Sequence, residues 1–166
     1  QDFGVFQPCG FGQKPCDDAC VPLTDPAHGC GNGACDPCQI ANAAAVCQGV
    51  DCAIGSCLNG FLNCDDAKDN GCEVDPKTDV GNCGACGNSC VVTHATAGCE
   101  AGKCTVATCD EDFGDCSGGA SDGCESNLQN DPEHCGSCDT KCGPSQGCQA
   151  GQCVLMCPDG KGDCNN

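Results

Sequence analysis

Apolar residues are sparse along this chain of 166 residues, and they rarely follow the period of a helix or a strand. Gly, Asp, Asn and Pro interrupt the sequence too often for long elements, which predicts short strands, turns and coil. Two stretches, CEAGKC at 99–104 and CQAGQC at 148–153, carry Gly at the centre and predict tight β-hairpins. The stretch DPCQIANAAAVC at 36–47 predicts one short helix, because Ala is the best helix former.

Composition explains why the apolar pattern is so weak. The chain has 26 Cys and 25 Gly but no Trp, no Tyr, one Met and five Phe. Such a chain cannot bury a large aliphatic core, so covalent links must hold it together. Disulfides persist only in an oxidising compartment. The composition therefore predicts a small disulfide-rich protein of the extracellular space or the cell surface.

The cysteines repeat with a period of 52 residues. Adding 52 to the number of each cysteine in the first set gives the second set without exception, and the two sets are Cys47, Cys52, Cys57, Cys64, Cys72, Cys83, Cys86, Cys90 and Cys99, Cys104, Cys109, Cys116, Cys124, Cys135, Cys138, Cys142. Gly71-Cys72-Glu73 recurs as Gly123-Cys124-Glu125 in the same register, and Phe61 recurs as Phe113. We expect the two Phe to be the small apolar plug of each unit. A fixed period of this length is typical of elongated repeat proteins in which each unit stacks on its neighbours.

Partial copies of the period lie on both sides of the two complete ones. The six cysteines from Cys9 to Cys38 fill the last six positions with looser spacing, and the four from Cys148 to Cys164 fill the first four. The predicted organisation is an apolar N-terminal segment followed by a partial repeat, two full repeats and a second partial repeat, with the bounds 1–8, 9–46, 47–98, 99–147 and 148–166.

Two sequence blocks resemble a known class of repeats. DVGNCGACGNSC (79–90) and the stretch from Asp131 to Cys153 resemble cysteine-rich repeats of secreted surface proteins in myxobacteria and related bacteria, and in part the plant stigma-specific proteins. The blocks NCDDAKDNGCE (63–73) and GDCSGGASDGCE (114–125) match the companion block of these repeats imperfectly, and the doubled cysteine common in the plant family is missing. The resemblance implies a secreted, disulfide-rich surface protein without enzymatic activity, and it names no ligand.

The C-x-x-C pairs at 35–38, 83–86 and 135–138 allow three interpretations. Structural zinc needs two such pairs, or one pair with His, converging on one ion, and each repeat has one pair. Redox-active dithiols also use this spacing. Three copies in an array dense with cysteine favour disulfides. No C-x-x-C-H occurs, which excludes covalently attached haem.

The acidic balance favours calcium as a ligand. The net charge is −18, which argues against nucleic acid and anionic membranes as partners, and no run is apolar enough to span a bilayer. Calcium takes six to eight oxygen ligands on flexible loops, and the candidate ligands are Asp65, Asp69, Asn70, Glu73, Asp115, Asp122 and Glu125. The alternative is that these residues only form turns with their own backbone. Apart from calcium, no cofactor is expected.

The histidines and hydroxyls form no recognised catalytic motif, so we expect no enzymatic activity. His28 and His134 share the context D-P-x-H, but the middle repeat has Asn82 at this position. Because an Asn seldom replaces a catalytic or metal-binding His, a turn or capping role is expected.

The N-terminal segment QDFGVFQP suggests how the protein assembles. Phe3, Val5 and Phe6 are hard to bury in a thin monomer. They either fold back on the first repeat or dock on the next subunit. Together with the partial repeats, the second option predicts head-to-tail self-assembly into a fibre. The alternatives are a stalk or adhesin that binds a protein or glycan, and a calcium-responsive module. The chain opens at Gln1 without an apolar leader, which predicts a mature product after signal-peptide cleavage.

Overall fold

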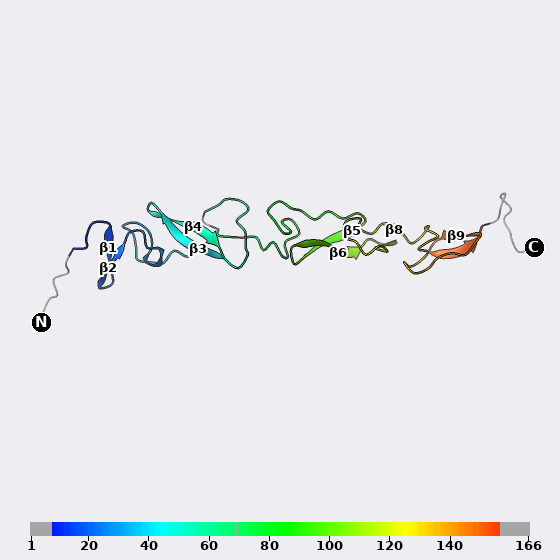
Figure 1. Cartoon of the computed structure of the whole chain (residues 1–166), viewed down its shortest axis with the longest axis horizontal. Coiled ribbons are helices and arrows are strands. Elements are labelled where there is room, and N and C mark those ends of the chain that lie inside the picture. Colours follow the sequence, from blue (N-terminus) through cyan, green and yellow to red (C-terminus); the bar gives the residue numbers. More distant parts are fainter. Residues whose placement is uncertain (1–7, 69, 157–166) are drawn as a thin grey trace, which may run out of the picture. The chain divides into compact units, whose positions relative to one another are not determined.

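The computed structural model describes residues 8–68 and 70–156 (Figure 1). The chain divides into two compact units, Gln1–Pro76 and Lys77–Asn166. Five two-stranded antiparallel sheets make up the regular structure of the described residues. The predicted assembly residues Phe3, Val5 and Phe6, and the calcium candidate Asp69, lie outside the described residues.

The first unit contains two of the five sheets. Strands β1 (Gln13–Cys16) and β2 (Ala19–Pro22) pair with each other, a 3-10 turn η1 (Pro26–His28) follows, and β3 (Ala43–Gln48) pairs with β4 (Asp51–Cys57). An isolated bridge between Leu62 and Val74 ties together the loop that comes after β4.

The second unit contains the other three sheets. Its strands, all antiparallel to their partners, are β5 (Ala95–Glu100) with β6 (Lys103–Cys109), β7 (Phe113–Gly114) with β8 (Ser126–Asn127), and β9 (Gln146–Gln149) with β10 (Gln152–Leu155). The β5–β6 hairpin repeats β3–β4 in detail, because both pairs shift register by one residue at the same place, after Ala44 and after Thr96. The repeat in the sequence is therefore a repeat in the backbone.

The two predicted hairpins at 99–104 and 148–153 are confirmed. Ala101 and Gly102 have φ angles of 50° and 78°, and Ala150 and Gly151 have 49° and 70°. Positive φ angles at both central residues are characteristic of a type I′ turn. The backbone twist of this turn matches that of the flanking strands. In the β3–β4 turn Gly49 has a φ of 69°, which fits the type II′ turn that has Gly first.

The predicted helix in 36–47 is wrong. Ala43 to Gln48 form β3, and no α-helix occurs among the described residues. The propensity of Ala for helix is a weak preference that tertiary context overrides. Here the pairing of Cys47 with Cys52 across the hairpin, and the bonds from both cysteines to the preceding loop, require an extended backbone.

Cystine takes the place of an aliphatic core. Twelve disulfides join the described cysteines, and nine of the twelve buried apolar residues in the described chain are half-cystines. Cys72, Cys83 and Cys124 are fully buried. The two Phe expected to act as plugs, Phe61 and Phe113, are only half-buried, so sulfur rather than aromatic rings fills the interior.

The disulfides also define the chemical environment of the protein. A fold that depends on this many cystines forms and persists only in an oxidising compartment. Among the described residues, no helix has the length and apolar character needed to cross a membrane.

The first unit also contains a buried lysine that the sequence did not single out. Lys14 on β1 is 3% exposed, and its Nζ donates to the carbonyl oxygens of Gly29 at 3.2 Å and Ala34 at 2.9 Å. A buried ammonium is tolerated only when hydrogen bonds replace its water. Lys14 therefore ties β1 to the loop that follows η1.

Replacing this lysine should weaken the first unit. Lys14→Met keeps the length of the side chain but leaves two carbonyls without their donor, and we expect a loss of about 1–3 kcal/mol in the free energy of unfolding. The matched control is Lys103→Met, since Lys103 is exposed on β6, and it should change stability by about 0.5 kcal/mol at most. Denaturant unfolding followed by circular dichroism measures both. Equal effects of the two substitutions would contradict a bracing role for Lys14.

Candidate functional site

The stretch NCGACGNSC (82–90) forms a compact loop before the β5–β6 hairpin. The backbone N–H of Cys83 donates to the carbonyl of Asn88 at 2.8 Å, the side-chain amide of Asn88 donates back to the carbonyl of Cys83, and Cys90 N–H donates to Val80 at 2.8 Å. The β9–β10 hairpin is preceded by the same kind of loop, in which the backbone N–H of Cys135 donates to the carbonyl of Thr140 at 2.8 Å. We call these segments, 30–38, 83–90 and 135–142, the brace loops.

Each brace loop is bonded by two disulfides to the hairpin that follows it. The first and last cysteines of the loop pair with two cysteines that face each other across the hairpin, as in Cys47↔Cys52 and Cys99↔Cys104. We call each set of four a sulfur quartet, and the three quartets pair as Cys30–Cys47 with Cys38–Cys52, Cys83–Cys99 with Cys90–Cys104, and Cys135–Cys148 with Cys142–Cys153. Within each quartet three Sγ atoms lie within 4.8 Å of one another. All are in disulfides, so they are not zinc ligands in this state.

Glycine allows the brace loop to lie against the turn of its hairpin. A Cβ on Gly84 would stand 2.7 Å from the carbonyl oxygen of Gly102 in the β5–β6 turn. A Cβ on Gly136 would stand 2.5 Å from the carbonyl oxygen of Gly151 in the β9–β10 turn. The Gly of the C-G-x-C pattern is thus explained by close packing of two backbones.

A second disulfide type closes the loops after the β3–β4 and β5–β6 hairpins. Cys57 bonds Cys72 and Cys109 bonds Cys124, and the Gly before the second cysteine lies against the residue that precedes the hairpin. The N–H groups of Cys72 and Cys124 donate to Ala41 and Thr93, each at 2.9 Å. The cysteines of the first partial repeat follow the same order, with Cys9–Cys20 as the closing bond.

A third disulfide type joins this closing loop to the next brace loop. It is seen in Cys16–Cys35 and Cys116–Cys138. Cys64 and Cys86 are disulfide-bonded as well. Each described cysteine of the predicted disulfide set is therefore used in the covalent frame, which agrees with the disulfide interpretation of the repeat.

The Glu that recurs in the Gly-Cys-Glu motif of both full repeats holds the acidic loop in place. Glu73 Oε1 accepts from the backbone N–H of Cys64 at 2.7 Å, and Glu125 Oε1 accepts from Cys116 at 3.1 Å and Ser117 at 2.9 Å. Both Glu are exposed, yet they act as anchors across the loop. The sequence allows either calcium ligands or residues bonded to their own backbone at these two positions, and these hydrogen bonds are of the second kind.

The other calcium candidates also bond within their own loops. Asp65 accepts from Ala67 N–H at 2.9 Å and from the amide of Asn70 at 2.7 Å, and these bonds, in that order, lower the pKa of the Asp65 carboxyl. Asp115 accepts from Gly118 N–H at 2.6 Å, and Asp122 accepts from the Ser117 hydroxyl at 2.8 Å. Within the described residues, no three carboxylates bring oxygens within 4.8 Å of one another. Calcium binding remains a prediction, which calorimetry with calcium and EDTA would test.

His28 and His134 act in turns, as expected. Asp25 caps η1, and its hydrogen bond with His28, at 2.9 Å, is the largest cause of the lowered pKa of the Asp25 carboxyl, followed by the bond from Ala27 N–H. His134 Nδ1 donates to the carbonyl of Cys138 at 2.8 Å. Asn82, at the equivalent place, accepts from Gly87 N–H at 2.8 Å. A His and an Asn thus brace the same loop in two copies.

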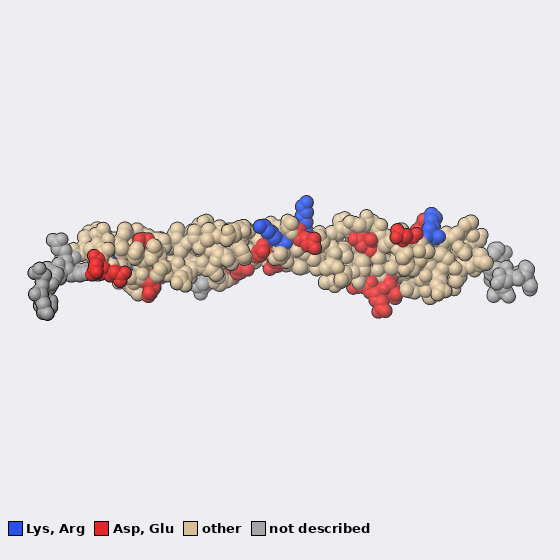
Figure 2. Space-filling model, turned by 90° about the horizontal axis from the view of Figure 1, so that it is seen from below, with Lys and Arg blue, Asp and Glu red and all other residues tan. Residues whose placement is uncertain are grey.

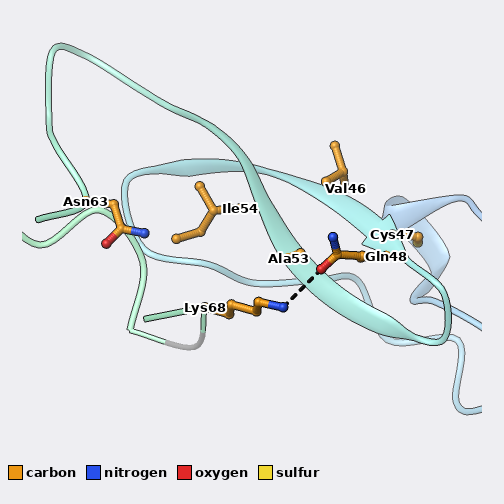
Figure 3. A pocket seen from close by; sticks show the side chains of 7 residues that line it. All are labelled: Val46, Cys47, Gln48, Ala53, Ile54, Asn63 and Lys68. Carbon is orange, nitrogen blue, oxygen red and sulfur yellow. Dashed lines mark hydrogen bonds between the residues drawn. The ribbon is translucent and has the colours of Figure 1, made fainter. Parts of the chain in front are cut away.

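A shallow groove lies beside the β3–β4 hairpin (Figure 3). Its lining residues are Val46, Cys47, Gln48, Ala53, Ile54, Asn63 and Lys68. Lys68 Nζ donates to Gln48 Oε1 at 3.1 Å across the groove. The second repeat has Gly98 in place of Val46 and Ala120 in place of Lys68. The second repeat therefore lacks both the Val side chain and the lysine ammonium that line the groove in the first.

The protein has far more acidic than basic side chains. On the face drawn in Figure 2, acidic side chains appear on both units and lysines are few, in keeping with the net charge of −18. A surface of this kind repels polyanions and attracts cations.

The comparisons with known proteins give no relative. No protein-family model matches the chain, and neither the curated proteins nor the solved structures contain a significant match.

Proposed function

We propose that the protein is a non-enzymatic structural protein of the extracellular space or cell surface, built to stay folded where it is exposed to heat and proteases. The observation that carries the proposal is the order of the disulfides. The hairpins β3–β4, β5–β6 and β9–β10 are each bonded twice to the loop before them, and the loops after β3–β4 and β5–β6 are each closed by a further disulfide. The likeness of the sequence blocks to secreted bacterial repeats agrees with this function.

The bonding pattern suits a load-bearing element. Each disulfide limits the unfolded chain and contributes about 2–4 kcal/mol, although the contributions of neighbouring bonds do not add. A cut in the main chain anywhere between the first and the last cysteine of a quartet leaves the two pieces joined by at least one of its disulfides. Resistance to proteolysis therefore needs no large apolar core.

We further propose that copies join head to tail into a fibre. Exposed apolar residues occur near both limits of the described chain: Phe11 before β1 is fully exposed, and Leu155 and Met156 at the end of β10 are 56% and 58% exposed. Apolar groups exposed in this way gain stability when a partner covers them. The apolar residues of the N-terminal segment 1–8 would add to this contact.

Removing the N-terminal apolar groups should abolish assembly. We expect the native protein to form filaments in electron micrographs and the variant Phe3→Ser/Phe6→Ser to remain monomeric, because each lost Phe removes about 1.5–3 kcal/mol of burial. The matched control, Gln1→Ser/Gln7→Ser, changes only polar residues of the same segment and should form filaments. Normal filaments from the Phe variant would contradict the donor role, and monodisperse native protein would contradict assembly itself.

The groove beside β3–β4 favours a second candidate function, a stalk or adhesin that binds a protein or glycan. A binding module should have a patch on one repeat that the other lacks, and the groove differs in this way. On a glycan array, Ile54→Ser/Lys68→Ala should lose any binding that the native protein shows. Val106→Ser, at the position equivalent to Ile54, should keep it. Binding that survives the groove substitutions would place the ligand elsewhere.

A further inference from the structure

The first sulfur quartet differs from the other two in a way that points to chemistry. The Sγ atoms of Cys30 and Cys38, which belong to different disulfides, lie 3.4 Å apart. Since neither carries a hydrogen, this is a direct contact between two disulfides. Cys52, the partner of Cys38, is exposed, whereas its equivalents Cys104 and Cys153 are partly buried. The first quartet thus has both a contact between its disulfides and a half-cystine that is exposed as a residue.

We propose that Cys52 is a thiol-exchange site, at which a small extracellular monothiol switches the first quartet to a second disulfide pairing. A thiolate attacks disulfide sulfur directly, and access to the sulfur governs the rate. The thiolate bonds Cys52 Sγ, the Cys38–Cys52 bond breaks, and Cys38 leaves as a thiolate. Cys52 then carries the small thiol as a mixed disulfide.

The contact between the disulfides determines the next step. The Cys38 thiolate lies beside Cys30 Sγ, which is bonded to Cys47. Attack there forms Cys30–Cys38, breaks Cys30–Cys47 and releases Cys47 as a thiolate. The neighbouring disulfide is at van der Waals distance, so this transfer needs no large movement of the backbone.

The register of the hairpin completes the exchange. Cys47 and Cys52 are directly opposite each other, next to the Gln48↔Asp51 pair that closes the turn. In this position two Cα atoms are about 4.5 Å apart, within the range of about 4.4–6.8 Å that a disulfide spans. The Cys47 thiolate therefore attacks Cys52, forms Cys47–Cys52 and expels the small thiol. The thiol is regenerated, so the change consumes no net oxidant or reductant.

The new pairing has a structural consequence. In the native pairing both bonds join the brace loop to the hairpin, whereas in the new one Cys30–Cys38 lies within the loop and Cys47–Cys52 within the hairpin. The covalent brace between them is lost, and only the main chain through 39–46 connects the two. The proposal is independent of fibre formation, because it concerns bonds within one chain.

Fragment release tests the proposal on the full-length native protein. The protein is incubated anaerobically with reduced glutathione, quenched with an alkylating agent, cut by a protease of alanine specificity within 39–46, and run on a non-reducing gel. In the native pairing the pieces stay joined by Cys30–Cys47 and Cys38–Cys52. After the exchange an N-terminal piece containing Cys30 and Cys38 separates from the rest. Mass spectrometry should find the Cys30–Cys38 and Cys47–Cys52 bonds in the product, and a glutathione adduct on Cys52 in the intermediate trapped at early times.

The other quartets supply the control within the same molecule. Cleavage in 91–98, between Cys90 and Cys99, should release nothing under the same treatment, because Cys104 is partly buried. Release at both places to the same extent would overturn the special role of Cys52. So would a protein that keeps every native bond in the presence of the thiol, or one that shows the Cys52 adduct without any Cys30–Cys38 bond.

Discussion

Gly123→Ala is expected to destabilise the second unit far more than Gly118→Ala, although the two residues have nearly the same backbone conformation. Their φ angles are 76° and 77°, so alanine at either position costs about 1–2 kcal/mol of left-handed strain. At Gly123 the new Cβ would also stand 2.3 Å from the carbonyl oxygen of Thr93, while at Gly118 nothing lies within 4 Å. The overlap should add about 1–3 kcal/mol and weaken the bond from Cys124 to Thr93.

The first unit offers the same comparison a second time. A Cβ on Gly71 would meet the carbonyl oxygen of Ala41 at 2.2 Å, and Gly60 has open space around it. Denaturant unfolding of the four alanine variants should show a large loss for Gly71 and Gly123 and a small loss for Gly60 and Gly118. Similar losses for all four would mean that positive φ, rather than close packing against the hairpin, explains the Gly of the Gly-Cys-Glu motif.

Removal of the Cys83–Cys99 disulfide should also cause a large loss in the free energy of unfolding. The bond closes a loop of 16 residues, and Cys83 is fully buried. In Cys83→Ala/Cys99→Ala we expect a loss of about 3 kcal/mol from chain entropy. A further loss of about 1 kcal/mol or more follows because sulfur is the packing material of this core. Limited proteolysis under non-reducing conditions should then cut the 83–90 brace loop.

A disulfide at the surface provides the matched control. Cys9–Cys20 closes a loop of 11 residues, and Cys20 is exposed. Loops of such similar length differ little in closure entropy, so Cys9→Ala/Cys20→Ala isolates the contribution of burial. The buried pair should cost more. Equal losses in the free energy of unfolding would show that the quartets act by chain entropy alone.

The cysteine spacing predicted the architecture, but it could not predict the bonds. The period of 52 residues and the Ala-Gly turns indicated short repeated hairpins, because turn residues act over a few positions. Pairing depends on distance in space. Eight cysteines allow 105 pairings, and the native ones join Cys83 to Cys99, across the predicted boundary between 98 and 99.

Local preferences misled where the covalent frame decides the backbone. The Ala run before Cys47 favours a helix by propensity, yet the bonds to Cys30 and Cys38 hold it as a strand. Glu73 and Glu125 remain calcium candidates, and the bonds to backbone N–H groups nine residues away show a local role that has the same sequence signature. Lys14 gave no signal, because a single lysine in a short strand is usually exposed, and only the carbonyls of the following loop show why this one is buried.

The two bonds of each quartet cross the limits of the repeat, and this has a consequence for how such genes change length. Deleting any 52 consecutive residues within the periodic region removes one cysteine from each of the eight positions of the repeat. The cysteine at the same position of the next repeat then takes the place of the one that was lost. The loop from one period then meets the hairpin of the following one, and no thiol is left over. Unequal crossing-over can therefore lengthen or shorten the protein at any phase of the period, without a selected breakpoint.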